Sequence, residues 1–353
     1  MRASFYALVF AAVAAILASC APPPPPPPPV PVGPPIDTIR KPLTDLGLRT
    51  YFGHAGGLYP LGSNQPQADH DSAGRARRNA IRPLDVYGDE NPLGKYVLLS
   101  IGMSGTTQEW CSQSAAPPCT KWSLMGRAAA DPTVNRHSLV IVNGAAEGED
   151  ASSWTSPTSA SYDRVRISRL EPLGLSEKQV QVVWVDLADT QPSKSLPSDS
   201  ADAYAFLSNL GEALRAMKVR YPNLQLAFLS SRSYGGYATI DFDPEPYAFE
   251  EGFSVKWAIE SQIDEMRGAA ANARAGSLNY AKKVAPWIAW GPYLWADGAT
   301  PRSDGLSWDR TDFEENGTHP SPSGESKIGG MLLDFFKTST YTRCWFLANQ
   351  YCL

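Results

Sequence analysis

Five short apolar runs recur along the chain from residue 96 onward. They are Tyr96–Ile101, Ser138–Asn143, Val180–Val185, Leu224–Leu229 and Pro286–Trp290. Apolar runs of this length between turn residues are typical of buried strands. The pattern therefore predicts five strands between residues 96 and 290.

Longer segments between these runs carry apolar residues at helical spacing. Three helices are predicted, over Ala201–Arg220, Phe249–Arg267 and Ser321–Lys337. Strands that alternate with helices indicate an α/β fold with a mostly parallel sheet and helices on both faces, a three-layer α/β/α sandwich. The earlier stretch Ile36–Leu93 is rich in Gly, Pro, Asn and Asp, and we expect loops there that wrap the core.

The N-terminal residues have the order of an export signal. Arg2 gives a positive start, Phe5–Ile16 is apolar but short for a membrane span, and small residues precede Cys20. Leu17–Cys20 resembles a lipobox, which implies that residues 1–19 are a lipoprotein signal peptide. Cys20 would then carry a diacylglyceryl group and a palmitate-type acyl chain, which together anchor the protein to a membrane.

An ordinary secretory signal with a chance cysteine is the alternative interpretation. Ala21 after the cysteine would permit sorting to the outer membrane of a Gram-negative bacterium, so we expect a lipid-anchored protein of the cell envelope.

A proline tract follows the cysteine, from Pro22 to Pro29, with further prolines up to Pro35. Such a tract favours an extended polyproline II rod and forms no core. We interpret residues 20–35 as a lipidated linker that holds the domain of residues 36–353 away from the membrane. A binding motif for a partner is the alternative.

The cysteine count fits an exported protein. Of 5 cysteines, four remain after Cys20, and they form two close pairs. The simplest connectivity is Cys111–Cys119 and Cys344–Cys352, which an oxidising compartment allows. A zinc site would favour CxxC spacing and nearby histidines, which the sequence lacks.

Charge and repeats add only exclusions. The net charge is −5 and no basic stripe is present, so nucleic acid is not expected as a partner. The sequence has no internal repeat and no second apolar run of spanning length.

Candidate chemistry lies after the predicted strands, where parallel sheets place their sites. Ser104 follows the first strand in Gly102-Met103-Ser104, a position suited to a nucleophile whose backbone N–H faces an oxyanion. After the second strand, Gly148 can supply another backbone N–H. Each feature alone is equally compatible with an ordinary turn.

His319 is the best candidate for a general base. It is one of 4 histidines and lies in Asn316-Gly-Thr-His319-Pro-Ser, directly before a predicted helix. Histidine suits this role because its ordinary pKa lies near neutrality.

Together, Gly102-Met103-Ser104, Gly148 and Asn316-Gly-Thr-His319-Pro-Ser resemble the SGNH (GDSL-type) hydrolases, in which the serine comes early and D-x-x-H comes late. The resemblance spans about Tyr96 to Lys337. The segment from Gly148 to Trp154 also resembles carbohydrate O-acetylesterases of that superfamily. It implies a Ser104 nucleophile, a His319 base, oxyanion donors at Ser104 and Gly148, and no metal or cofactor.

The chain departs from the family pattern in three places. Asn316 stands where the family usually has Asp; it could orient His319 through its own carbonyl, or Asp312, Glu314 or Glu315 could supply the acid. The usual Asn of a GxND block, a third oxyanion donor, is missing from Asp186-Leu187-Ala188-Asp189. Met103 replaces the usual Asp or Gln before the serine.

Arg232, Trp154 and Trp290 are further candidates for contacts with substrate, with packing as the alternative for each. The expected function is a serine esterase that removes acetyl or other acyl groups, most plausibly from a carbohydrate. Two alternatives remain open: a lipase, and a catalytically impaired lipoprotein of this fold that binds glycan or envelope components.

Overall fold

The computed structural model describes residues 36–113, 116–350 and 352. The predicted signal peptide, Cys20 and the proline linker lie outside the described residues. The strands are β1 (Ile36–Asp37), β2 (Thr50–Tyr51), β3 (His54–Ala55), β4 (Tyr96–Gly102), β5 (Leu139–Asn143), β6 (Val180–Asp186), β7 (Leu226–Leu229) and β8 (Trp287–Trp290). The α-helices are α1 (Leu43–Leu46), α2 (Ala68–Arg78), α3 (Ser104–Trp110), α4 (Leu124–Ala130), α5 (Ala160–Val165), α6 (Asp202–Arg220), α7 (Tyr247–Met266), α8 (Pro322–Thr338) and α9 (Arg343–Phe346).

Five of these strands form one parallel sheet in the order β5-β4-β6-β7-β8. All five correspond to the predicted apolar runs, and the three predicted long helices are α6, α7 and α8. Because every strand of the sheet is parallel, the carboxyl ends of β4, β6 and β7 lie at one edge. The α/β fold class predicted from the sequence is confirmed.

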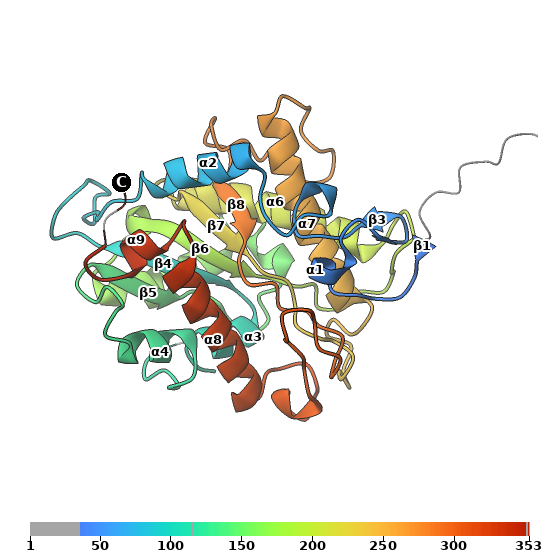
Figure 1. Cartoon of the computed structure of the whole chain (residues 1–353). Coiled ribbons are helices and arrows are strands. Elements are labelled where there is room, and N and C mark those ends of the chain that lie inside the picture. Colours follow the sequence, from blue (N-terminus) through green and yellow to red (C-terminus); the bar gives the residue numbers. More distant parts are fainter. Residues whose placement is uncertain (1–35, 114–115, 351, 353) are drawn as a thin grey trace, which may run out of the picture. The chain divides into compact units, whose positions relative to one another are not determined.

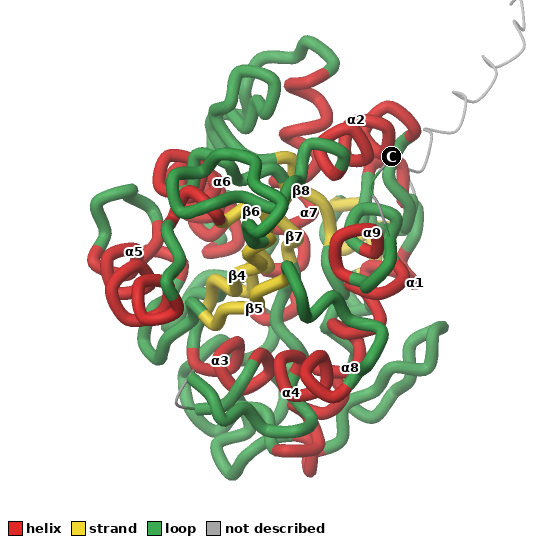
Figure 2. Tube along the Cα trace, turned by 90° about the vertical axis from the view of Figure 1, so that its left-hand side faces the viewer, coloured by secondary structure: helices red, strands yellow, loops and turns green. Residues whose placement is uncertain are grey.

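Helices cover both faces of the sheet. Alternate residues of β6 point to opposite faces, so Val183 packs with the residues of α6 and α7 while Trp184 packs with those of α3 and α8. Trp184 stacks on Trp110 of α3 with ring centroids 5.2 Å apart. Figure 1 shows α6 and α7 on one side of the sheet and α3, α4 and α8 on the other, and Figure 2 shows α3, α4 and α8 grouped together away from α6.

The stretch predicted to be loops contains a real helix, α2. Its sequence is mostly polar, so no apolar periodicity announces it. The helix packs through small and aromatic contacts instead. The His70 ring stacks on Trp287 at 4.8 Å, and any side chain at Gly74 would collide with the same indole. The prediction of loops alone for residues 36–93 was therefore wrong.

Both predicted disulfides are present, Cys111–Cys119 directly after α3 and Cys344–Cys352 at the end of the chain. Within the part of the chain that the structure describes, no helix has the length and apolar character to cross a membrane.

Candidate active site

Ser104 lies at the sharp turn between β4 and α3. Gly102 must be glycine there, because a Cβ would collide with Thr106 and with the carbonyl oxygen of Asp186. Thr106 Oγ1 donates to that same carbonyl at 2.9 Å and ties the turn to β6. Ser104 is the first residue of α3, so its side chain lies at a helix N-terminus at the carboxyl edge of the sheet.

His319 meets Ser104 from the loop before α8. The Ser104 Oγ and His319 Nε2 atoms are 2.7 Å apart, although the residues are 215 positions apart in sequence. The Glu314 backbone N–H donates to the His319 carbonyl at 2.8 Å and closes this loop. Burial, and next the charge of Arg232, lowers the pKa of His319, so the ring is neutral at pH 7.

Asn316 occupies the orienting position beside His319, as predicted, but it presents its amide nitrogen. Asn316 Oδ1 accepts from the backbone N–H groups of Thr318 at 2.9 Å and His319 at 3.0 Å. These two donors fix the amide orientation, so Nδ2 faces His319 Nδ1 at 2.8 Å. An amide N–H donates, which makes Nδ1 the acceptor and places the ring proton on Nε2.

This tautomer has a direct chemical consequence. Nε2–H donates to Ser104 Oγ, whereas a base that removes the serine proton needs a free Nε2 lone pair. Turning the amide would offer Oδ1 to Nδ1–H, but it would also point Nδ2 at two backbone N–H groups. An aspartate would satisfy both sides at once, because both of its oxygens accept.

The next residue, Gly317, occupies a position that only glycine fits. Its φ is +69°, and a Cβ would collide with the carbonyl oxygen of Tyr237. Its N–H donates to the Glu314 carbonyl at 2.9 Å. The Asn-Gly dipeptide therefore sits in a tight turn.

A cleft of about 290 Å³ opens over Ser104 and His319. All of its lining residues are polar: Ser104, Thr107, Gln108, Gln113, Glu147, Glu314, Asn316 and His319. We call Ser104, His319, Asn316 and this lining the cleft flank of the site. Gly148 follows Glu147 in an exposed loop with φ +76°, and its role as an oxyanion donor stays a prediction.

Charged residues that sequence reasoning missed lie on the other side of Ser104. Buried carboxylates surround the Arg232 guanidinium, and the nearest, Asp243 Oδ2, is 3.4 Å from Nε. We call Arg232 with Glu109, Asp186, Asp243 and Glu251 the interior flank.

Burial dominates the titration of these carboxyl groups. It raises the pKa of Asp186 to about 6 and of Asp243 to about 7, and it raises those of Glu109 and Glu251 well above their ordinary range. No apolar periodicity or motif marks these four positions, which converge only in the folded chain. Among the described residues no group of His, Cys, Asp and Glu is arranged to hold a metal ion.

Three of the predicted site residues have other roles. Trp154 is fully buried against Tyr162, and Trp290 is 4% exposed and donates through Nε1 to the Leu58 carbonyl, so both indoles belong to the core. Asp312 is 2% exposed and binds Lys327 Nζ at 2.5 Å and Ser323 Oγ at 2.6 Å. Its carboxylate holds the start of α8 and does not orient His319.

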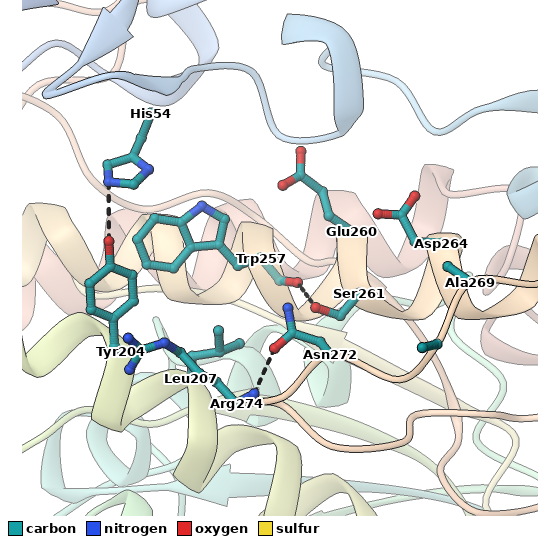
Figure 3. A pocket seen from close by; sticks show the side chains of 11 residues that line it. His54, Tyr204, Leu207, Trp257, Glu260, Ser261, Asp264, Ala269, Asn272 and Arg274 are labelled. Carbon is teal, nitrogen blue, oxygen red and sulfur yellow. Dashed lines mark hydrogen bonds between the residues drawn. The ribbon is translucent and has the colours of Figure 1, made fainter. Parts of the chain in front are cut away.

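A larger hollow of about 400 Å³ lies away from Ser104, between β3, α6 and α7 (Figure 3). Tyr204 stacks on Trp257 at 5.1 Å, and its hydroxyl lies 3.3 Å from His54 Nε2. Glu260 and Asp264 also line it. Its lining includes neither Ser104 nor His319, so this hollow and the Ser–His pair are separate places on the molecule.

Comparisons with known proteins give similarity only at the level of structure. No protein-family model matches the chain, and a search of curated proteins found no match. A crystal structure described as a GDSL-like lipase from Parabacteroides merdae is 15% identical, with 72% of this chain and 97% of that chain covered and a TM-score of 0.37.

Two further solved structures show similarity of the same low degree. Est24, a carbohydrate acetylesterase from Sinorhizobium meliloti, is 15% identical over 68% of this chain and 97% of its own, with a TM-score of 0.34. A short chain dehydrogenase from Mycobacterium smegmatis is 13% identical over 75% and 96%, with a TM-score of 0.28.

Proposed function

We propose that this protein is a serine esterase of the SGNH type that removes acyl groups from a hydroxyl-rich substrate, most plausibly a carbohydrate. The observation that carries the proposal is the 2.7 Å contact between Ser104 Oγ and His319 Nε2 at the floor of an open cleft. Both side chains stand at the carboxyl edge of a parallel sheet, where such folds place their chemistry.

The reaction would proceed through a covalent acyl-enzyme. Ser104 Oγ attacks the ester carbonyl while its proton passes to His319 Nε2, and the alcohol leaves with that proton. Water, activated by the same histidine, then attacks the acyl-enzyme and releases the carboxylic acid. The backbone N–H of Ser104 and a donor from the Gly148 loop would hold the negative oxygen.

The composition of the cleft favours a polar alcohol over a lipid. Every lining side chain is polar, and Gln108, Gln113 and Glu147 offer both donors and acceptors to hydroxyl groups. An acyl chain of a lipid would find no apolar wall among these residues. This supports a carbohydrate ester over a lipase substrate.

Asn316 supports a second candidate function, a glycan-binding protein with an impaired site. The base form of His319 requires the Asn316 amide to turn and lose two hydrogen bonds from backbone N–H groups. Two such bonds are worth about 1–3 kcal/mol. We therefore expect slow turnover rather than none, and a protein without turnover would match the binding alternative.

Hydrolysis of p-nitrophenyl acetate by the full chain tests the enzyme against the binder. Ser104→Ala and His319→Ala should each lower turnover by about 10³-fold or more. His137→Ala is the matched control, because this exposed histidine lies outside the cleft and should keep full activity. Equal rates in all four proteins would exclude the Ser–His mechanism.

We also propose that the domain is tethered to the bacterial envelope through lipid on Cys20. The lipobox-like Leu17–Cys20 and the proline tract support this placement. Labelling of cells with a palmitate analogue should mark the protein but not its Cys20→Ser variant. Equal labelling of both would rule the anchor out.

A further inference from the structure

A small cavity of about 20 Å³ lies on the interior side of Ser104. Ser104, Ala188, Arg232 and His319 all contribute to its walls. A cavity needs roughly 10–15 Å³ to hold one water molecule, so this one accepts a single oxygen atom. The carbonyl oxygen of an ester bound for attack by Ser104 is an atom of this size.

Arg232 reaches this cavity from the end of β7. Its Nη2 donates to the Thr318 carbonyl at 3.3 Å, directly before His319. Its Nη1 is 3.4 Å from the point where a Cβ on Gly105 would lie. The guanidinium therefore lies against the first turn of α3 and next to the nucleophile.

Ala188 is a small residue in the wall of this cavity. It is 3% exposed and follows β6, in the Asp186–Asp189 segment that lacks an asparagine. Its methyl group offers no hydrogen-bond donor. On this side, an oxyanion would therefore receive no hydrogen bond from Ala188 or from the backbone donors of the cleft. Arg232 is the cationic side chain that lines the same cavity.

We propose that Arg232 is an oxyanion-stabilising catalytic residue, with one guanidinium N–H donating to the substrate carbonyl oxygen in the cavity beside Ala188. The proposal rests on the esterase function above. When the Ser104 Oγ–carbon bond forms, the electron pair of the C=O π bond moves to that oxygen and the serine proton moves to His319. Collapse restores the C=O bond and expels the alcohol, which takes the proton.

The interior carboxylates hold the guanidinium in position. Asp243 lies 3.4 Å from Nε, while Asp186, Glu251 and Glu109 also face the charge. Arg232 stays protonated at all working pH values. A charged donor that is fixed before the reaction needs no reorganisation when the oxyanion forms, which is the condition for strong stabilisation.

Two single variants test the proposal without removing the charge from the cluster. Arg232→Lys keeps the charge but loses the fork of donors, and Ala188→Val fills the cavity while Arg232 remains. Each should lower kcat on p-nitrophenyl acetate by about 10²–10³-fold, the usual loss for one oxyanion donor. KM should change little, because the interaction forms only in the transition state.

A rescue and a control separate catalysis from structure. Ala188→Asn combined with Arg232→Lys should recover at least tenfold in kcat, because the amide supplies a donor to the same cavity. Arg302→Lys is the matched control: Arg302 is buried and, like Arg232, pairs with an aspartate, Asp304, but it does not line this cavity or the cleft. It should lower the melting temperature without lowering kcat.

The outcomes are distinguishable. A kcat within threefold of wild type in both Arg232→Lys and Ala188→Val would overturn the role of Arg232 while the esterase function stands. A fall in kcat that only parallels lost folded protein, with no rescue by Ala188→Asn, would overturn it as well. Absence of turnover in wild type and in Asn316→Asp would overturn both proposals together.

Discussion

The two flanks of Ser104 are organised by different forces. On the cleft flank, hydrogen bonds with defined direction join Ser104, His319 and Asn316, and the site is open to water. On the interior flank, the Arg232 guanidinium meets buried carboxyl groups with little hydrogen bonding. Arg232 Nε and both carboxylate oxygens of Asp243 have no hydrogen-bond partner among the described residues. The comparison teaches that donor direction should govern the first flank and net charge the second.

Asn316→Asp should have the largest effect, because it replaces the amide donor by an acceptor and adds a negative charge beside His319. Both carboxylate oxygens accept, so Nδ1–H is favoured and Nε2 becomes free to take the serine proton. The expected gain in kcat lies between about 10-fold and 10⁴-fold, bounded by two hydrogen bonds and by the effect of the reverse change in a serine protease. Steady-state kinetics on p-nitrophenyl acetate measure it.

Asn316→Gln is the control for that gain. It keeps an amide on a longer side chain and should not raise kcat. A rate for Asn316→Asp no higher than that of wild type would show that donor direction does not limit the cleft flank.

Asp243→Asn should change the pH dependence of stability, which reports on the interior flank. Burial raises the pKa of Asp243 from 3.8 to about 7, so the folded state binds its proton more tightly than the unfolded state. That contribution is complete below the unfolded pKa and is lost as pH rises through about 7. The free energy of unfolding should therefore fall from pH 5 to pH 8, by on the order of 2 kcal/mol from this residue.

Urea midpoints at about pH 5 and about pH 8 measure this fall. Asp243→Asn should make it smaller, while Asp186 and Asp189, whose pKa values burial raises to about 6, keep part of it. Asparagine also tolerates the positive φ of +49° at this position. An unchanged difference between the two pH values would contradict a charge-governed interior flank.

Glu147→Gln should give the smallest effect, on the acid limb of the pH–rate profile. Glu147 is exposed and raises the pKa of His319. Without its charge, the midpoint should move lower, and the shift should vanish at about 1 M salt. A shift that persists at high salt would show instead that Glu147 acts on His319 from a buried environment, where salt does not screen its charge.

Hydrophobic periodicity predicted the frame of this molecule well. The five strands are continuous apolar runs, and helices α6–α8 carry apolar residues at helical spacing. Burial of these residues determines how the helices pack on the sheet. Helix α2 was not predicted, because it packs through Gly74 and His70 against one tryptophan. Such a contact produces no periodic pattern of apolar residues in the sequence.

The site divides in the same way. Ser104 could be found because it follows a strand, and His319 because its segment directly precedes a predicted helix. The direction of the Asn316 amide could not, because two backbone donors 2 and 3 residues later decide it. Likewise the sequence allows Asp312 as the acid that orients His319, whereas in the structure its carboxylate binds Lys327 and Ser323.

The turn at Gly317 also bears on how the protein ages. An asparagine before glycine is chemically fragile, because the glycine nitrogen can attack the side-chain amide and release ammonia. Here the Gly317 N–H is engaged with the Glu314 carbonyl, and close packing on Tyr237 forbids any residue but glycine. The folded state thus protects the Asn316 amide, whose conversion to an acid would change the hydrogen bonding of His319. A heated or long-unfolded sample loses that protection. Water then opens the cyclic imide at either carbonyl, so the chain would carry aspartate or isoaspartate at position 316.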